Sequence, residues 1–199
     1  MKALILVDIQ NDFLPNGSLA VTNGDKIIPF VNKLVKYFDG LVITTQDFHP
    51  LSHKSFASNN KGKPIGELGE LNGQAQVMWP NHCVEGTTGT EFSKELNLDK
   101  VVKNFPKGTN PEVDSYSGFF DNDHKSSTGL GEYLKEKKVT EVVVVGLALD
   151  YCVKATAMDS QKLGFKTSVL LNGTKAVNLN PGDDQIAINE LINNGVKVL

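Results

Sequence analysis

Short apolar runs alternate with longer helical patterns along the chain, and this alternation constrains the fold more than any other feature. The runs are rich in β-branched residues and too short for ordinary helices. They are Ala3–Val7, Leu41–Thr45, Val101–Phe105, Val142–Val145, Thr167–Leu171 and, as a short edge strand, Val196–Leu199. The stretches with helical spacing or helical end signals are Asp25–Phe38, Thr128–Lys137, Asp150–Leu163 and Asp183–Asn193. Strands that alternate with helices predict a parallel sheet covered by helices on both faces.

The four consecutive valines at 142–145 lack polar alternation, which is typical of a strand buried on both faces. We find no internal repeat and no low-complexity linker. A chain of 199 residues is long enough for one sizeable hydrophobic core. The sequence therefore predicts a single domain over residues 1–199.

Residues 46 to 92 interrupt the alternation of strands and helices. They show little periodicity and contain many Gly, Pro, Asn and His residues. A loop of this length in a compact domain is usually functional or disordered. The density of His, Trp, Cys and Asp residues favours a functional segment.

Charge and composition narrow the classes of protein. The 20 Lys and Arg residues against 23 Asp and Glu residues give a net charge of −3, without the basic excess typical of proteins that bind nucleic acids or anionic membranes. No apolar stretch approaches the roughly 18 residues of a membrane span, and the short apolar run before Asp8 does not resemble a signal peptide. Two cysteines do not make a disulfide scaffold. We therefore expect a cytoplasmic protein without nucleic-acid or membrane partners.

Chemically useful side chains follow four of the predicted strands. Asp8 follows the first strand, Asp47 and His49 follow the second, Lys107 the third and Cys152 the fourth. In open α/β sheets, ligands bind outside the carboxyl ends of the strands. We therefore expect these side chains to gather at one edge of the sheet.

Cys152 is the candidate nucleophile. It lies near the start of a predicted helix, with Asp150 as a plausible cap, and a helix N-terminus favours the thiolate. Asp8 could accept its proton and Lys107 could stabilise the thiolate or an oxyanion. A buried structural role is the commoner fate of a single cysteine. Cys83 is the competing nucleophile, but no helix begins behind it.

Two lysines lie near the third predicted strand. Lys103 and Lys107 are four residues apart and would share a face of the strand, so alternation cannot choose between them. Lys103 falls inside the predicted strand, whereas Lys107 follows Pro106, which we expect to end the ladder because proline lacks an N–H donor. Position therefore favours Lys107 as the residue at the ligand-binding edge.

Three of the four histidines, His49, His53 and His82, lie in the irregular segment. Asp47 and His49 are two residues apart, a spacing suited to chelation, and His82 could add a third ligand. Three protein ligands with open positions are typical of a catalytic divalent metal site. His124, among charged neighbours, is interpreted as a surface residue.

Several motifs, in order along the chain, resemble those of the nicotinamidase family within the isochorismatase-like cysteine hydrolases. They are Asp8-Ile9-Gln10-Asn11-Asp12-Phe13, Gln46-Asp47-Phe48-His49-Pro50, Trp79-Pro80-Asn81-His82-Cys83-Val84, Lys107-Gly108 with Asp114-Ser115-Tyr116-Ser117, and Gly146-Leu147-Ala148-Leu149-Asp150-Tyr151-Cys152-Val153. The family usually has tryptophan at the position of Phe48, and this departure keeps both neighbouring ligands. The resemblance implies a three-layer α/β/α sandwich with a mainly parallel, six-stranded sheet.

The resemblance implies a catalytic triad of Asp8, Lys107 and Cys152. The family typically has a cis peptide bond at the position of Leu147-Ala148. That bond would direct the backbone N–H groups of Ala148 and Cys152 at an oxyanion.

The resemblance also implies one divalent metal ion. We expect Zn²⁺, with Mn²⁺ or Fe²⁺ as alternatives, held by Asp47, His49 and His82. Family members differ in the next coordination position, so His53 is either a direct ligand or a partner through water. The metal motif separates nicotinamidases from most other cysteine hydrolases of the superfamily.

The implied activity is hydrolysis of the small molecule nicotinamide to nicotinate and ammonia in NAD salvage, with pyrazinamide as a second substrate. Phe13, Trp79 and Tyr116 match aromatic positions that wall the family's pocket, although aromatic residues there could equally belong to the core. A homo-oligomer is compatible with the sequence.

Two rival classes of protein stay open at this point. A different cysteine hydrolase, acting on another amide or carbamoyl group, would not need the metal motif. A non-enzymatic binding module with a structural metal would not explain why an acid, a lysine and a cysteine converge on one edge.

Overall fold

The computed structural model describes all residues 1–199 and contains a six-stranded sheet in the order β5-β2-β1-β6-β7-β8. Every neighbouring pair in this sheet is parallel, which confirms the predicted parallel architecture. Its strands are β1 (Lys2–Val7), β2 (Leu41–Asp47), β5 (Val101–Lys107), β6 (Glu141–Leu147), β7 (Lys166–Lys175) and β8 (Lys197–Val198).

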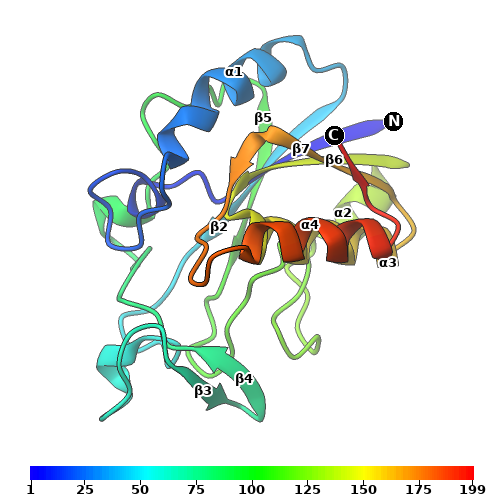
Figure 1. The fold of residues 1–199 in the computed structure, drawn as a ribbon. Helices are drawn as coiled ribbons and strands as arrows, with labels where there is room; N and C mark the ends of the chain where they lie inside the picture. The colour runs from blue at the N-terminus through cyan, green and yellow to red at the C-terminus, as the bar shows by residue number, and fades with distance from the viewer.

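Helices cover both faces of the sheet. Helix α1 (Ile28–Tyr37) lies on one face, and α2 (Leu130–Glu136), α3 (Lys154–Lys162) and α4 (Asp183–Asn193) lie on the other (Figure 1). Along β1, Leu4 and Leu6 belong to the core cluster under α1, whereas Ile5 and Val7 belong to the core cluster under the other three helices. The central strand is therefore buried on both faces. None of the helices has the length and apolar character needed to cross a bilayer.

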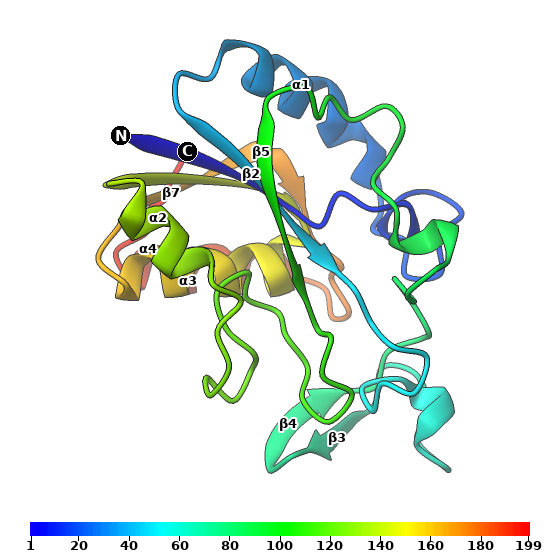
Figure 2. The same cartoon turned by 180° about the vertical axis from the view of Figure 1, so that it is seen from behind.

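A small antiparallel hairpin, not predicted above, lies within the irregular segment. It consists of β3 (Leu68–Leu71) and β4 (Gln74–Val77) and projects beyond the carboxyl ends of β2 and β5 (Figure 2). Asn72 and Gly73 join its strands with φ angles of 50° and 74°. An Asn-Gly pair with two positive φ angles is the favoured two-residue hairpin turn, so the signal was present in the sequence.

The expectation that Pro106 ends its strand is wrong. Strand β5 continues to Lys107, and Pro106 and Lys107 lie opposite Gln46 and Asp47 of β2. The carbonyl of Lys107 accepts the N–H of Phe48, so Lys107 faces β2. Because successive residues of a strand face opposite sides, the nitrogen of Pro106 faces the open side of this edge strand, where no N–H donor is needed. Lys107 is therefore the last residue of the strand.

The expectation that Asp150 caps the helix after β6 is also wrong. The chain leaves β6 through a π-helical turn, Leu149–Val153, and only then enters α3. The carboxylate of Asp150 accepts the backbone N–H groups of Val177 and Asn178 at 2.9 and 2.8 Å. Asp150 thus joins this turn to the segment after β7, which the local sequence could not indicate.

The close approach of β6 to β1 gives a first prediction. A Cβ at Gly146, where φ is 126°, would collide with the backbone carbonyl of Val7. Gly146→Ala should lower the free energy of unfolding by ~3 kcal/mol or more, because backbone must shift in the sheet centre. Gly164→Ala is the control, because φ is 92° there and a Cβ would meet nothing within 4 Å. It should cost only about 1 kcal/mol. Equal losses in urea titrations would contradict this account.

Candidate active site

The carboxyl ends of four neighbouring strands place four reactive side chains together. Asp8 follows β1 with a positive φ of 50°, Asp47 ends β2 and Lys107 ends β5, whereas Cys152 lies in the turn after β6. All four residues are buried. The ligand atoms of Asp8, Asp47 and Cys152 lie within 4.8 Å of one another.

Lys107 lies at the centre of this group. Its Nζ donates to a carboxylate oxygen of Asp47, to the carbonyl of Ser115 at 2.7 Å and to Sγ of Cys152 at 3.4 Å. The same atom is 3.0 Å from Oδ2 of Asp8. A buried ammonium loses its hydration, and these groups take the place of the lost water.

Lys103 lies away from this group. Its Nζ lies over the rings of Phe105 and Tyr133, 4.9 and 4.7 Å from their centroids. Strand alternation could not decide which of the two lysines lies at the ligand-binding edge. The structure places Lys107, and not Lys103, beside Cys152.

The charges of this cluster stabilise one another. Burial would lower the pKa of Lys107, but Asp47 and Asp8 together hold it well above its ordinary value. Burial would raise the pKa of Asp47, but Lys107 and then His49 hold it well below its ordinary value. Lys107 and Asp47 are therefore an ion pair over the whole physiological range.

The thiol of Cys152 is protonated at neutral pH, contrary to the expectation from its position near a helix start. Burial raises its pKa, and although Lys107 opposes this, Asp8 and Asp47 raise it further, well above the ordinary value. Two carboxylates and a dry environment outweigh one ammonium. The thiol therefore holds a proton that must be removed for the sulfur to react.

Asp8 offers an oxygen that can take this proton. Its Oδ1 accepts the hydroxyl of Thr45 at 2.6 Å, whereas its buried Oδ2 lies 3.0 Å from Nζ of Lys107 and accepts no other hydrogen bond. Burial raises the pKa of Asp8, which Lys107 opposes and Asp47 reinforces. A carboxylate with a raised pKa and an oxygen that still has a lone pair available is suited to accept and return a proton.

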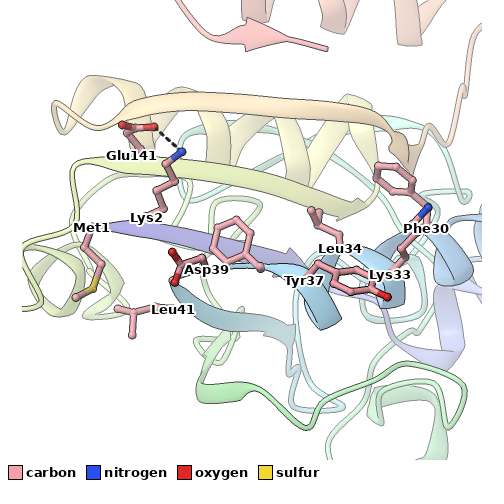
Figure 3. Close-up of a pocket in the computed structure, with 11 residues that line it drawn as sticks. Met1, Lys2, Phe30, Lys33, Leu34, Tyr37, Asp39, Leu41 and Glu141 are labelled. Carbon is pink, nitrogen blue, oxygen red and sulfur yellow. Dashed lines mark ion pairs between the residues drawn. The ribbon is translucent and has the colours of Figure 1, made fainter.

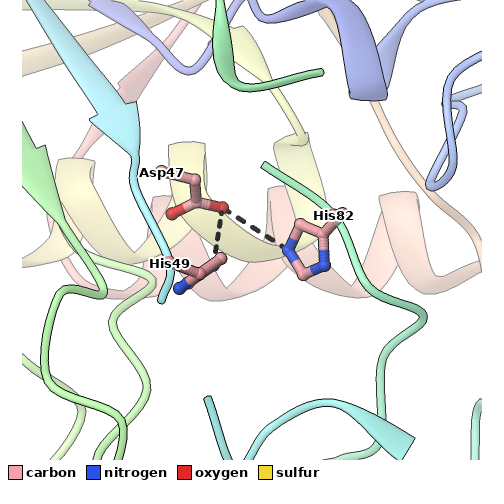
Figure 4. A group of neighbouring side chains, drawn as sticks. All are labelled: Asp47, His49 and His82. Carbon is pink, nitrogen blue, oxygen red and sulfur yellow. Dashed lines mark ion pairs between the residues drawn. The ribbon is translucent and has the colours of Figure 1, made fainter. Parts of the chain in front are cut away.

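A second group of side chains fits a divalent metal ion. Nε2 of His49 and Nε2 of His82 each lie 3.7 Å from Oδ2 of Asp47, and the three ligand atoms lie within 4.8 Å of one another (Figure 4). Nδ1 of His49 lies 2.8 Å from the carbonyl of Gly108, and Nδ1 of His82 lies 2.8 Å from that of Pro80. Carbonyls accept only, so each Nδ1 carries the proton and each Nε2 lone pair faces Asp47.

Protons compete with a metal ion for this group. Burial would lower the pKa of His49, but Asp47 outweighs it and raises that pKa above its ordinary value. A histidine binds a metal ion in its deprotonated form, so the affinity of this group for a cation falls as the pH falls through the pKa of His49.

His53 lies beside the metal-binding group and not within it. Its ring centroid is 4.5 Å from that of His49, and its ligand atom groups with those of His49 and Asp114. Its Nδ1 lies 2.7 Å from the hydroxyl and 3.2 Å from the N–H of Ser55, while its buried Nε2 has no partner. Burial and then His49 lower its pKa to about 4, so the ring is neutral at pH 7.

A narrow pocket opens above both groups. Its aromatic walls are Phe13, Trp79 and Tyr116, and Cys152 and Ala148 lie in it. Nε1 of Trp79 donates to the hydroxyl of Tyr116 at 3.2 Å, which ties two walls together. The sequence reasoning did not single out four further lining residues: Leu19, Asp114, Tyr151 and Val177. Asp114, Tyr151 and Leu19 stand inside motifs that carry the resemblance, Leu19 in Gly17-Ser18-Leu19-Ala20-Val21, whereas Val177 comes from a segment that only the fold brings here.

A larger hollow lies at the opposite end of the sheet, near the amino ends of β1 and β2 (Figure 3). Its lining includes Met1, Phe30 and Tyr37, and Lys2 pairs with Glu141 at 3.6 Å. It contains no cysteine and no histidine. The chemistry of the chain is therefore concentrated at the carboxyl edge.

Comparisons with known proteins agree with this architecture. The model of the isochorismatase domain matches residues 2–199. The chain is 45% identical over 195 residues to a nicotinamidase of Acinetobacter baylyi, covering 98% of this chain and 90% of that protein. It superposes with a TM-score of 0.96, at 44% identity, on a nicotinamidase and pyrazinamidase of Acinetobacter baumanii, covering 100% of this chain and 95% of that one. A pyrazinamidase of Pyrococcus horikoshii in complex with zinc gives a TM-score of 0.81 at 37% identity, with 100% and 98% covered.

The electrostatics of Cys152 give a second prediction. In a Cys83→Ala background, alkylation of Cys152 by iodoacetamide should be slow at pH 7 and still rise above pH 9, because only the thiolate reacts. Lys107→Met should slow it at least about tenfold, because the cation that lowers this thiol's pKa is lost. Lys103→Met, which removes an exposed lysine, should change the rate by less than about threefold. The reverse order of the two variants would contradict the assignment of Lys107.

Proposed function

The chain belongs to the isochorismatase domain family, and from this membership we propose that it hydrolyses nicotinamide to nicotinate and ammonia, a step of NAD salvage. The observation that carries the proposal is that the reactive cysteine cluster and the candidate metal-binding group lie side by side at one pocket. The buried acid, lysine and cysteine lie against an Asp-His-His set suited to a metal ion. The 45% identity to a nicotinamidase supports the choice of substrate.

We propose that Cys152 is the nucleophile and Asp8 its base. The sulfur attacks the carboxamide carbon while the thiol proton passes to Oδ2 of Asp8. Because burial raises the pKa of the thiol, the sulfur needs this base in order to react. Lys107, 3.4 Å from the sulfur, stabilises its developing negative charge. The N–H groups of Ala148 and Cys152 are the proposed donors to the oxyanion, and the Leu147–Ala148 peptide bond is cis, as the resemblance implied.

The tetrahedral intermediate then expels ammonia. Asp8 returns its proton to the leaving nitrogen, the C–N bond breaks and a thioester on Cys152 remains. Water attacks the thioester carbon and gives a proton to Asp8. The C–S bond breaks and Asp8 returns the proton to the sulfur. The product leaves as the carboxylic acid and loses its proton to water as nicotinate, so that each turnover consumes one water and restores the thiol.

The proposed metal ligands are Asp47, His49 and His82, with zinc as the proposed ion. A divalent ion held there would supply a Lewis-acid position for the ring nitrogen of the substrate. We propose that His53 acts next to this group through water, because its ligand atom does not group with the other three. Support for zinc comes from the zinc complex of the Pyrococcus pyrazinamidase.

The pocket suits a flat heteroaromatic amide. Phe13, Trp79 and Tyr116 present ring surfaces, and the pocket has mostly hydrophobic lining residues. Pyrazinamide keeps the carboxamide and a ring nitrogen at the matching position, so we propose it as a second substrate. The identity to the Acinetobacter baumanii nicotinamidase and pyrazinamidase supports this proposal.

The rival classes explain fewer of the observations. A cysteine hydrolase for another amide has no use for two imidazoles oriented by carbonyls toward one carboxylate. A binding module has no use for a thiol beside a buried carboxylate whose pKa is raised. We further propose that residues 1–199 form one domain and that the protein works in the cytoplasm, because both of its cysteines are free and Cys152 must remain reduced.

Ammonia release from nicotinamide tests the proposed reaction. Cys152→Ala should lower kcat by at least about a thousandfold, because the covalent route is lost. Its melting temperature should stay within a few degrees of the parent. Cys83→Ala should keep most of the activity, because that thiol packs in the core under α1 and its one hydrogen bond goes to the Gly89 carbonyl, at 3.9 Å. An inactive Cys83→Ala with an active Cys152→Ala would show that the nucleophile is misassigned.

Metal content tests the proposed ligands. Elemental analysis should find about one divalent ion per chain, and His82→Ala should lose most of it because three ligands become two. KM for nicotinamide should rise at the same time. The control is His124→Ala, since His124 is exposed and lies 3.9 Å from Asp159, outside the group. Full metal occupancy and normal kinetics in His82→Ala would refute the site.

A further inference from the structure

Strand β2 changes its neighbour on one side as it approaches the active site. Up to Thr45 it pairs with β1. From His49 onward its neighbour is the segment around Cys83, whose carbonyl accepts the N–H of His49 at 3.0 Å, while the N–H of Glu85 donates to the carbonyl of His49 at 2.8 Å. Asp47 lies in the gap between these two neighbours.

The side chain of Gln10 fills this gap. Its Oε1 accepts the N–H of Asp47 at 2.8 Å, and its Nε2 donates to the carbonyl of Asp47 at 2.8 Å. These are the two hydrogen bonds that a neighbouring strand would make. Nε2 also donates to the carbonyl of Thr90 at 2.9 Å, so a reversed amide would place its oxygen against two carbonyls. The contacts therefore fix the orientation of the amide.

The acceptor for the Asp47 N–H is the part of this role that belongs to Gln10 alone. The side chain is fully buried, so water does not compete for its partners. The hydroxyl of Thr90 also donates to the carbonyl of Asp47, at 3.0 Å, but only Gln10 accepts the Asp47 N–H. An unpaired buried N–H is costly, so without Gln10 the backbone of Asp47 would move to find another partner.

The orientation of Asp47 matters because its two oxygens face different groups. One oxygen accepts Lys107, and the other faces Nε2 of both His49 and His82. A small rotation of the Asp47 backbone would spoil both sets of contacts. Gln10 itself does not line the pocket, so any effect it has must pass through Asp47.

We infer that Gln10 is a positioning residue that holds Asp47 in the orientation required for both the metal ion and Lys107. The inference rests on the proposed function, in which Asp47 is a metal ligand. Gln10 follows Asp8 by two residues, so the turn that supplies the proposed base also aligns the proposed ligand. The motif Asp8-x-Gln10 thereby couples two parts of the site in one short segment.

Zinc affinity, measured by competition with a chelator of known affinity, tests the inference without relying on activity. Gln10→Met keeps the length of the side chain and removes its donor and acceptor, and it should weaken zinc binding at least about tenfold. Gln10→Glu keeps an acceptor for the Asp47 N–H but places its second oxygen against the carbonyls of Asp47 and Thr90, so it should also weaken zinc binding, by at least about threefold. Melting temperatures of all variants are recorded in parallel.

Gln46→Met is the matched control. Gln46 also donates to the carbonyl of Thr90, at 2.7 Å, and accepts from Asn104 at 2.7 Å, but it makes no side-chain hydrogen bond to Asp47. It should leave zinc affinity within about threefold of the parent. A similar loss in Gln46→Met, or an unchanged affinity in Gln10→Met, would overturn the inference.

Two further outcomes are distinguishable. If Gln10→Met does not fold, Gln10→Glu is compared with Gln46→Glu instead. Gln10→Glu must then bind zinc at least about threefold more weakly than Gln46→Glu. Equal affinities in that pair would overturn the inference. A parent protein that binds no zinc would instead refute the proposed metal site itself, before any variant is compared.

Discussion

The site depends on one buried charge, the ammonium of Lys107. A cation without water is costly, and here the two carboxylates of Asp8 and Asp47 and the carbonyl of Ser115 compensate it. Asp8, Asp47 and Lys107 meet because three parallel strands end at one edge of the sheet, and Ser115 lies in the segment that follows β5. The same cation contacts the proposed base, the proposed metal ligand and the proposed nucleophile, so it joins the two halves of the chemistry.

Much of the fold followed from local patterns. The β-branched runs indicated all six strands of the main sheet, because burial on both faces leaves a clear apolar signature. The hairpin around Asn72-Gly73 was missed because the surrounding segment lacks alternation, although the turn itself is a strong local signal. Pro106 was misinterpreted because the rule against proline in a ladder depends on whether the strand lies at an edge, which is a property of the whole sheet.

The site was predictable as a set of residues and less so as a set of interactions. Position at strand ends and the motifs brought out Asp8, Lys107 and Cys152 from sequence alone. The partners of Asp150 and the role of Gln10 depend on segments far along the chain, so no local pattern could show them. The pKa of Cys152 is set by burial and by charges from three other strands, which is why a rule based on one helix terminus gave the wrong direction.

A protonated resting thiol has a consequence for selectivity. Electrophiles and oxidants react with thiolates, so a buried cysteine with a raised pKa is protected from them while the pocket is empty. In the proposed mechanism the proton moves to Asp8 only as the sulfur bonds to a carbon, and Lys107 and the oxyanion donors then stabilise the charge that forms. Reactivity is therefore tied to a carboxamide placed against the sulfur. The rigid hydrogen bonds around Asp8 and Asp47 serve this purpose, because a catalytic group activated only in the transition state must already be in place when the substrate arrives.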